Sequence, residues 1–201
     1  KVTLKNGNIM ELEGPKTCGE VAAAISEGLA RVAMAAELNG EVVDLRTVID
    51  KDCALSILTF EDEGGRRTFR HTASHILAQA VKRLYPDVKL TIGPSIDNGF
   101  YYDFDTPPFT AEDLEKLEAE MKKIVKEDLP ITRFTKTREE AIAFFEEKNE
   151  PYKIELIQEL PEGEEISFYQ QGEFIDLCAG PHLPRTGMVK AFKLTSATGA
   201  Y

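Results

Sequence analysis

Long hydrophobic runs are missing from this sequence. None of its apolar stretches approaches the roughly 18 to 20 residues needed to span a bilayer, and the opening residues, KVTLKNGNIM, lack the apolar core of a signal peptide. Internal repeats and low-complexity tracts are absent as well, and the balance of apolar and charged residues is typical of a globular protein. We therefore expect a cytoplasmic protein of one or two domains with no membrane partner.

Cysteine is scarce. The chain has three cysteines, Cys18, Cys53 and Cys178, an odd number spread far apart in the sequence. This differs from the dense, even pattern that cross-links small secreted domains. We expect reduced thiols rather than a disulfide framework.

Positive charge is also in short supply. The chain carries 24 Lys and Arg against 35 Asp and Glu, a net charge of −11. Because phosphate is bound mainly by Lys and Arg, this excess of acidic residues argues against a protein that clamps nucleic acid with its whole surface. Basic residues nevertheless flank two histidine motifs, as expected where a phosphate-bearing substrate docks. They are Arg66, Arg67 and Arg70 before the first motif, and Arg185, Lys190 and Lys193 after the second.

The beginning of the chain has the pattern of a small β-grasp domain. Asn-Gly pairs at 6–7 and 39–40 lie between short strand-like segments, which predicts two hairpins. Between the hairpins, Thr17 and Glu20 have the spacing of a helix capping box. Residues 54–60 supply a closing strand. Hairpin, helix, hairpin and strand in this order predict a ubiquitin-like β-grasp without a histidine or a cluster of catalytic residues.

A charged, glycine-containing segment, residues 61–67, reads as a linker. It predicts a first domain over 1–62 and a larger domain over 63–201, and the fold class is α+β. The elements expected in the second domain are a helix over 68–85 that ends at Pro86, strands within 88–93 and 99–105, helices that begin at Thr110 and Thr137, and strands with loops over 152–194.

The three histidines of the chain fall in two motifs. His71 and His75 lie four positions apart in RHTASH, and His182 follows Cys178 by four positions in DLCAGPH. On a helical wheel, the apolar side chains of residues 73–84 centre about 190° from the midpoint of the first two histidines. We therefore expect these imidazoles to face away from the helix's own apolar stripe, and ordinary solvent exposure without a role remains one alternative.

The two motifs together resemble a ligand set for a metal. Two imidazoles on one helix, with a cysteine and a histidine on a Gly-Pro loop, suit a borderline-soft ion such as zinc. HTASH lacks the glutamate of the HExxH metalloprotease helix. Four protein ligands would also fill a tetrahedral zinc and leave no position for a catalytic water. Two alternatives stay open: a closed structural metal, or an open site in which some of these groups perform chemistry.

One further residue favours the open site. Asp176 precedes Cys178 by two positions, so it points to the same side if this segment is a strand, and it could orient an imidazole or hold a water. Lys153, taken alone, reads as an ordinary solvated lysine.

Several longer motifs occur in a characteristic order. They are RHTASHILAQAVKRLYP, IGPSIDNGFYYDFD, YKIEL and DLCAGPHLPRTG. In this order they resemble the amino-terminal region of bacterial threonyl-tRNA synthetases, which consists of a TGS domain and an editing domain. The His and Cys quartet alone would also fit the related alanyl-type editing domains, in which it holds zinc.

This resemblance implies a TGS-like β-grasp domain followed by a threonyl/alanyl-type tRNA editing domain that hydrolyses the ester of seryl-tRNA(Thr). Serine lacks one methyl group of threonine, which is worth only about 1 to 3 kcal/mol of discrimination, so a second sieve is required. The partner would be tRNA(Thr) charged with serine. The resemblance assigns catalytic positions to His71, His75, Lys153, Asp176, Cys178 and His182, and places Gly93, Pro94 and Tyr102 near the terminal adenosine. Within this set we expect His75 and His182 to position water or transfer protons, and Lys153 to neutralise developing negative charge.

The resemblance also bears on cofactors. It implies no metal requirement for editing, with zinc at the quartet as the alternative, and it assigns ATP and a catalytic zinc to domains that these residues lack. We therefore expect no aminoacylation by this chain, a parent that continues beyond Tyr201, and a parent homodimer formed through the missing domains. The competing hypotheses are a non-enzymatic tRNA-binding module with a structural zinc and, more weakly, a regulator related to alarmone enzymes, which lacks support because no His-Asp metal pair is present.

Overall fold

The structure is a computed structural model that describes residues 1–198, apart from the side chain of Ser95. The chain forms two compact units, Lys1–His71 with Gly180–Pro184, and Thr72–Ala179 with the residues from Arg185 onward. The division falls within helix α3 (Glu63–Leu84), and the predicted boundary between residues 62 and 63 stays a prediction. None of the helices in the described part is both long and apolar enough to cross a membrane. Tyr201, which the sequence analysis singled out, lies outside the described residues.

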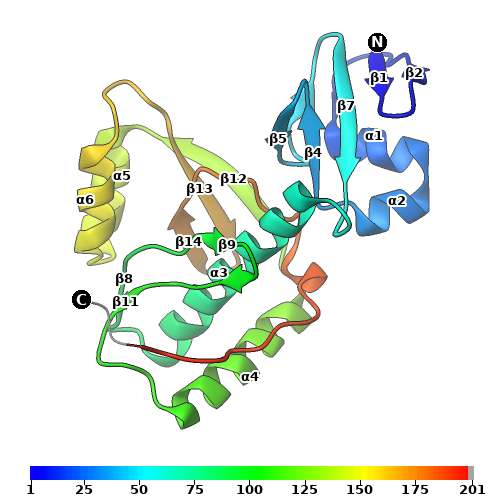
Figure 1. Cartoon of the computed structure of the whole chain (residues 1–201). Helices are drawn as coiled ribbons and strands as arrows, with labels where there is room; N and C mark the ends of the chain where they lie inside the picture. Colours follow the sequence, from blue (N-terminus) through cyan, green and yellow to red (C-terminus); the bar gives the residue numbers. More distant parts are fainter. Residues whose placement is uncertain (199–201) are drawn as a thin grey trace. The chain divides into compact units, whose positions relative to one another are not determined.

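The first unit contains the predicted ubiquitin-like β-grasp (Figure 1). Its sheet has the order β2-β1-β7-β4-β5, in which the central strand β7 runs parallel to β1 and antiparallel to β4. The strands are β1 (Val2–Leu4), β2 (Ile9–Met10), β4 (Ala35–Leu38), β5 (Glu41–Val43) and β7 (Cys53–Leu58), with a small pair β3 (Lys16–Thr17) and β6 (Val48–Ile49) beside helices α1 (Cys18–Ile25) and α2 (Glu27–Val32).

Local chemistry explains these elements. Asn39 and Gly40 have φ values of 51° and 87°, the left-handed pair that a tight hairpin between β4 and β5 requires. Thr17 and Glu20 form the predicted capping box at the start of α1. Apolar side chains from the sheet and α1 then close one core, which includes Val2, Val21, Ala36, Leu45 and Leu55.

The prediction of a linker over residues 61–67 is wrong, because helix α3 already begins at Glu63. A Cβ at Gly65 would lie 1.9 Å from the carbonyl oxygen of Thr59, and a Cβ at Gly64 would lie 2.7 Å from Leu58 Cδ1. The two glycines thus let the first turn of the helix approach the end of β7 closely. They serve packing rather than flexibility.

Helix α3 ends at Leu84, just before Pro86 as predicted, but it is buried around its whole circumference from Thr72 to Val81. His75, predicted to face away from the apolar stripe, is only 4% exposed. Polar side chains on this buried helix have polar partners. Gln79 Nε2 donates to the carbonyl oxygen of Gln171 at 3.2 Å, and Gln171 Nε2 donates back to Gln79 Oε1 at 2.7 Å.

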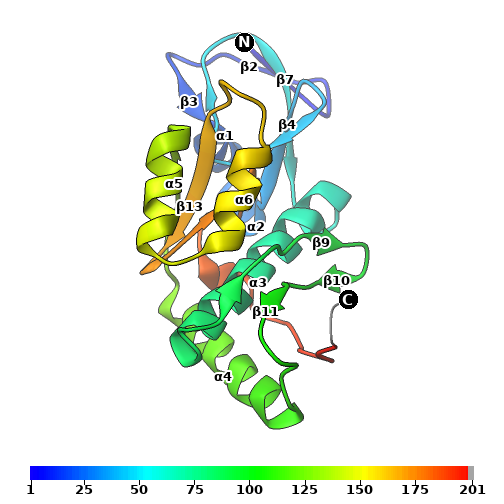
Figure 2. The same cartoon turned by 90° about the vertical axis from the view of Figure 1, so that its left-hand side faces the viewer.

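The second unit contains an antiparallel sheet of β12 (Ile131–Lys136), β13 (Ile166–Gln171) and β14 (Phe174–Leu177). Helices α5 (Arg138–Glu147) and α6 (Pro151–Glu159) lie side by side against it (Figure 2), over a core with Phe145, Ile157 and Phe168. The prediction of strands and loops from residue 152 is therefore wrong at its start. Pro151 occupies the first turn of α6, where its missing N–H costs no helix hydrogen bond.

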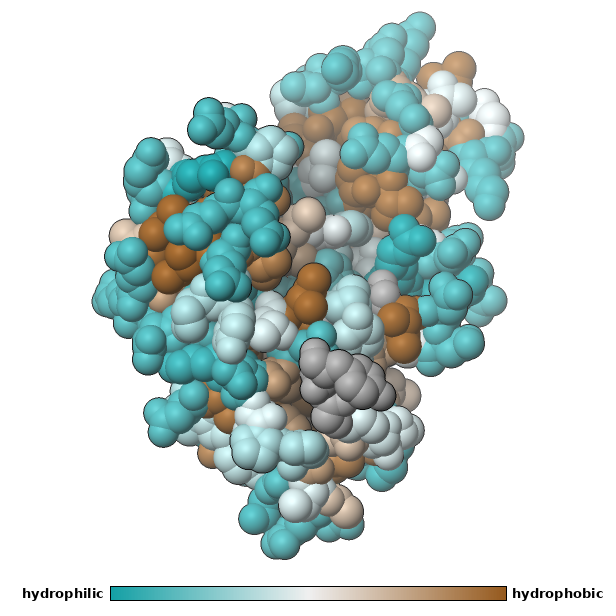
Figure 3. Space-filling view, turned by 60° about the vertical axis from the view of Figure 1, so that its left-hand side comes forward, coloured by the Kyte–Doolittle hydropathy of each residue, from teal (hydrophilic) through white to brown (hydrophobic). Residues whose placement is uncertain are grey.

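The remaining elements of this unit match the expected pattern, except for the strand Ser95–Ile96, which lies between the two predicted strand segments. Thr110 caps α4 (Ala111–Glu127), whose buried face includes Leu117, Met121 and Ile124. Two short strand pairs precede it, β9 (Ser95–Ile96) with β10 (Gly99–Phe100), and β8 (Lys89–Leu90) with β11 (Phe104–Asp105). Hydrophilic residues cover much of the face in Figure 3, with apolar residues in separate patches, consistent with the high charge of the sequence.

Candidate functional site

Three buried side chains form a closed polar network in the second unit. Lys153 on α6 places its Nζ 2.9 Å from Asp176 Oδ1 on β14 and donates a hydrogen bond to the Tyr102 hydroxyl at 2.8 Å. The Tyr102 hydroxyl donates in turn to Asp176 Oδ2 at 2.7 Å. All three residues are at most 7% exposed. Lys153 is thus a buried residue, and its interpretation from the residue alone as a solvated lysine is wrong.

The network keeps Asp176 charged. Burial by itself would raise the pKa of this carboxyl group, but the Lys153 ammonium, His75 and the hydrogen bond from Tyr102 outweigh burial and lower the pKa below its usual value. Burial and the neighbouring Asp176 carboxylate raise the pKa of Tyr102 well above its usual value. The stable arrangement is therefore a carboxylate paired with an ammonium, and a neutral phenol that donates to the carboxylate.

His75 adjoins this network from α3. Its Nδ1 lies 3.6 Å from Asp176 Oδ2, and its ring meets Tyr102 and Phe174 edge to face, with centroids 6.2 and 6.3 Å away. A carboxylate facing Nδ1 favours a proton on that nitrogen. The prediction that Asp176 could orient an imidazole therefore has a geometric basis.

Gly93 and Tyr102, predicted near the substrate, lie against each other. A Cβ at Gly93 would come 2.1 Å from Tyr102 Cδ2, so only glycine fits beside this ring. The carbonyl oxygen of Gly93 also accepts a hydrogen bond from Ser74 Oγ at 2.8 Å. Pro94 is half-buried next to them. This contact helps to fix the tyrosine whose hydroxyl bonds Lys153 and Asp176.

The other two histidines approach each other. The rings of His71 and His182 have centroids 4.5 Å apart and planes inclined by 33°, and His182 is fully buried. Cys178 continues the chain from β14, where its N–H donates to the Ser167 carbonyl oxygen at 3.1 Å and its own carbonyl oxygen accepts from Ser167 Oγ.

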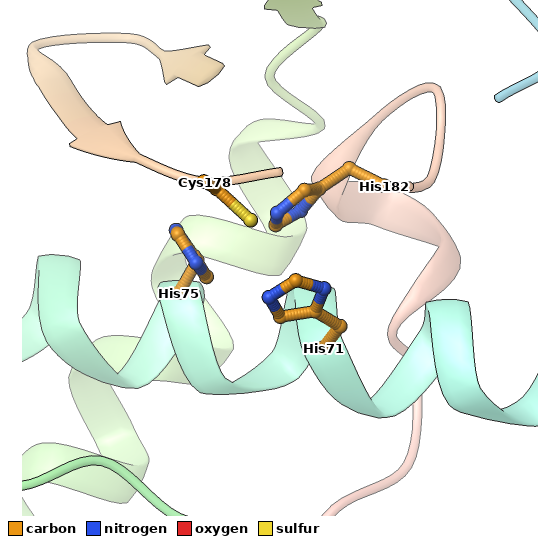
Figure 4. Close-up of side chains that lie close together, drawn as sticks. All are labelled: His71, His75, Cys178 and His182. Atoms are coloured by element: carbon orange, nitrogen blue, oxygen red, sulfur yellow. The ribbon is translucent and has the colours of Figure 1, made fainter. Parts of the chain in front are cut away.

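The four predicted ligand-type side chains come together, as Figure 4 shows. One ligand atom from each of His71, His75, Cys178 and His182 lies within 4.8 Å of the others. Two of these residues come from α3 and two from the segment that follows β14. Imidazole nitrogens with one thiolate are a donor set that suits zinc, so the group could hold a metal ion.

A pocket of about 450 Å³ lies beside Tyr102. Its wall includes the aromatic residues of 100–104, Phe109 and the extended segment 193–198. Tyr102 and Phe104 are stacked in this wall, with ring centroids 5.0 Å apart. The volume and the aromatic lining are within the range of sites that bind small organic groups.

Two of the basic residues that flank the motifs form ion pairs with acidic side chains. Arg185 pairs with Asp128 at 2.8 Å, and Lys193 pairs with Glu118 at 3.2 Å. Their role toward phosphate stays a prediction. Sequence reasoning missed Asp44 and Arg46, which bond the backbone around His182. No motif marks these two residues, because their partners lie more than 130 positions away.

Comparisons with known proteins define the class of the chain. The TGS domain family matches residues 1–59, and the family described as "Threonyl and Alanyl tRNA synthetase second additional domain" matches residues 166–200. The second match contains Asp176, Cys178 and His182. The chain thus combines a TGS domain with the editing-associated domain of aminoacyl-tRNA synthetases.

Relatives that match along the whole chain are more specific. The chain is 66% identical over 202 residues to the threonine–tRNA ligase of Acetivibrio thermocellus, 63% identical over 201 residues to that of Caldanaerobacter subterraneus, and 61% identical over 202 residues to that of Clostridium novyi. Each alignment covers 100% of this chain but only 31 to 32% of the relative, so the chain spans about a third of their length. Along its whole length, the chain is similar to the amino-terminal part of these threonine–tRNA ligases.

Proposed function

We propose that this chain proofreads tRNA(Thr) in the cytoplasm by hydrolysing the ester that joins wrongly attached serine to the tRNA. The observation that carries the proposal is the buried network of Asp176, Lys153 and Tyr102 with His75 beside it. Burying a carboxylate and an ammonium is costly unless both are paired and hydrogen-bonded. Such a network next to three further ligand-type side chains supports a catalytic role.

Each group has a defined part in the proposed reaction. A water attacks the ester carbonyl carbon while His75 accepts its proton, with Asp176 holding the imidazole in orientation. The Lys153 ammonium has three N–H groups, and two of them face Asp176 and Tyr102. We assign the third to the negative charge that develops on the carbonyl oxygen. The bond between this carbon and the ribose oxygen then breaks, and His182 supplies the proton that the ribose oxygen takes up.

The remaining residues shape the substrate pocket. We assign His71 and Cys178 to its walls, and the pocket beside Tyr102 to the terminal adenosine, since its aromatic lining suits stacking of a base. Gly93 packs against the tyrosine ring, and we assign Pro94 with it to the surroundings of the terminal adenosine. Threonine would be spared because its additional methyl group clashes with the wall of the pocket.

A metal is not required in this proposal, although the donor set fits one. If zinc binds, His71, His75, Cys178 and His182 would hold it, and it would supply either structural rigidity or polarisation of an oxygen. The steps assigned above depend on the side chains of the chain itself. The non-enzymatic alternative, a tRNA-binding module with a structural zinc, predicts no ester hydrolysis at all.

The test is a deacylation assay. The chain is incubated with serine-charged and with threonine-charged tRNA(Thr), and loss of the ester is followed at high protein concentration so that weak tRNA binding does not limit the rate. We expect rapid loss of the seryl ester and survival of the threonyl ester. His75→Ala should abolish the reaction, whereas the exposed Lys51→Ala should leave it unchanged. Equal inertness toward both esters would refute the proposal.

A further inference from the structure

The segment that carries His182 belongs to the same compact unit as the β-grasp sheet. Gly180–Pro184 joins residues Lys1–His71 in this unit. Two side chains from the turn after β5, Asp44 and Arg46, contact its backbone directly. This contact gives the β-grasp domain a physical connection to one of the proposed catalytic histidines.

The contact holds both sides of His182. The N–H of His182 donates to Asp44 Oδ1 at 2.6 Å. Its carbonyl oxygen accepts from Arg46 Nη1 at 3.0 Å, and the carbonyl oxygen of Leu183 accepts from Arg46 Nη2 at 2.5 Å. Hydrogen bonds with a charged partner are about twice as strong as neutral ones, and a guanidinium holds two acceptors in a fixed geometry.

Asp44 and Arg46 also form an ion pair with each other that is largely shielded from bulk water. Arg46 Nη1 lies 3.1 Å from Asp44 Oδ1, and Asp44 is 6% exposed. His182 and Leu183 are fully buried. Because the ion pair and its backbone partners are largely desolvated, breaking one member leaves unpaired polar groups in the interior.

The turn itself is fixed to the β-grasp core. The N–H of Thr47 donates to the Asp44 carbonyl oxygen at 3.1 Å. Leu45 lies in the hydrophobic core, and its carbonyl oxygen accepts from the Gly19 N–H at the start of α1 at 2.9 Å. Side chains mounted on such a turn have little freedom to move.

We propose that Asp44 and Arg46 are positioning residues for His182, so that the β-grasp domain takes part in editing. This inference rests on the proposed function. Asp44 and Arg46, which we call the clamp, restrain the backbone on both sides of the histidine and bond neither of its ring nitrogens. They also hold His182 beside His71, whose ring lies 4.5 Å away.

The experiment compares variants of the whole chain. Arg46→Met and Asp44→Ala remove the two halves of the clamp, and Arg46→Lys keeps the charge without the two-pronged geometry. Arg31→Met and Asp50→Ala are the matched controls, since both residues are exposed in the same domain. Three quantities are measured: thermal unfolding, amide hydrogen exchange and the imidazole NMR signals of His182, and kcat and KM for seryl-tRNA(Thr) deacylation.

We expect both clamp variants to lower kcat at least tenfold while KM changes less than twofold, because the ester still binds but the imidazole is misplaced. Amide hydrogen exchange at Gly180, His182 and Leu183 should accelerate. The NMR signals of the His182 ring should shift. Arg46→Lys should recover part of the rate, and the controls should behave like the unmodified chain. If Arg46→Met fails to fold, Arg46→Lys and Asp44→Ala carry the comparison.

Unchanged exchange, ring signals and kcat in folded clamp variants would overturn the inference. A loss of stability with kcat unchanged in the remaining folded protein would also overturn it, because the clamp would then be only structural. If the unmodified chain hydrolyses neither ester, the proposed function fails, and with it the role in editing. In that case the exchange and NMR data still decide whether Asp44 and Arg46 position His182.

Discussion

Tyr102 donates its phenolic hydrogen to Asp176 across 2.7 Å, and both residues are buried. They lie 74 positions apart in the sequence, yet the phenol also accepts from Lys153, so a single hydroxyl group links both charges of the network. The prediction that Tyr102 lies near the terminal adenosine stays a prediction. In the structure its hydroxyl bonds the buried pair of Asp176 and Lys153, and its ring lines the adjacent pocket.

Replacing Tyr102 with phenylalanine should therefore affect both stability and rate. We expect Tyr102→Phe to lower the free energy of unfolding by about 1 to 3 kcal/mol, the usual cost of leaving buried polar groups without a partner. Tyr152→Phe is a matched control, because Tyr152 donates to Asp105 at 2.6 Å in an exposed position and should cost much less. Urea unfolding of the two variants and their deacylation rates check this. Equal losses of stability would contradict the buried network.

Removing the ammonium should have a larger effect. Lys153→Met leaves the Asp176 carboxylate buried without its ionic partner, and we expect a loss of about 3 to 5 kcal/mol in the free energy of unfolding together with loss of deacylation. The exposed Lys51→Met serves as the control. A Lys153→Met protein as stable as the control would show that the ion pair does not form.

Metal content separates the two alternatives for the quartet. We expect protein purified without chelators to carry much less than one zinc per chain, and we expect chelator treatment to leave deacylation unchanged. Elemental analysis of the same sample that is used in the assay measures both. Stoichiometric zinc whose removal stops the reaction, and whose return restores it, would make the quartet a functional metal site.

Acid should weaken an ion pair at the end of α3. Arg83 donates to Glu173 at 2.5 Å, and this bond holds the pKa of Glu173 below its usual value of 4.5. A lowered folded-state pKa stabilises the protein above pH 4.5, and this contribution disappears as the pH falls through the folded-state value. The difference in unfolding free energy between the unmodified chain and Glu173→Gln should thus be largest near neutral pH and vanish in acid. A difference that is independent of pH would contradict the ion pair.

The thiols should differ in reactivity. Burial, and next the neighbouring Cys53, raise the pKa of the Cys18 thiol to about 11, and its side chain is fully buried, whereas Cys53 is half-buried. Alkylation at pH 8 should therefore modify Cys53 well before Cys18. Mass spectrometry of peptides from partly alkylated protein measures the order, and unfolded protein should lose the difference.

The sequence predicted the features that depend on near neighbours. The capping box at Thr17, the helix starts at Thr110 and Thr137 and the Asn-Gly hairpins are set within a few residues, and all are present. The quartet was predictable because two short motifs use up every histidine of the chain. Features that depend on distant partners were not. Lys153 is buried because Asp176 and Tyr102 lie beside it, and nothing near it in the sequence indicates this.

The glycines of residues 61–67 show the same limit. Adjacent glycines usually indicate a flexible connection, but Gly65 is needed because the backbone of Thr59 leaves no room for a side chain, and Gly64 packs against Leu58. Helix α6 was missed for a related reason, since a proline reads as a break until its position in the first turn is known.

The hydrogen bonds that the side-chain amides of Gln79 and Gln171 donate to each other's residues have a consequence for homologous sequences. Each side chain donates to the other residue, and both are almost fully buried. Losing one side-chain amide leaves the other with an unmet hydrogen bond, whereas exchanging both for apolar residues of similar volume removes both amides, and only the Gln171 carbonyl oxygen and Glu173 then lose a donor. Among homologous sequences these two positions should therefore change together, and natural chains with only one of the two glutamines should be rare.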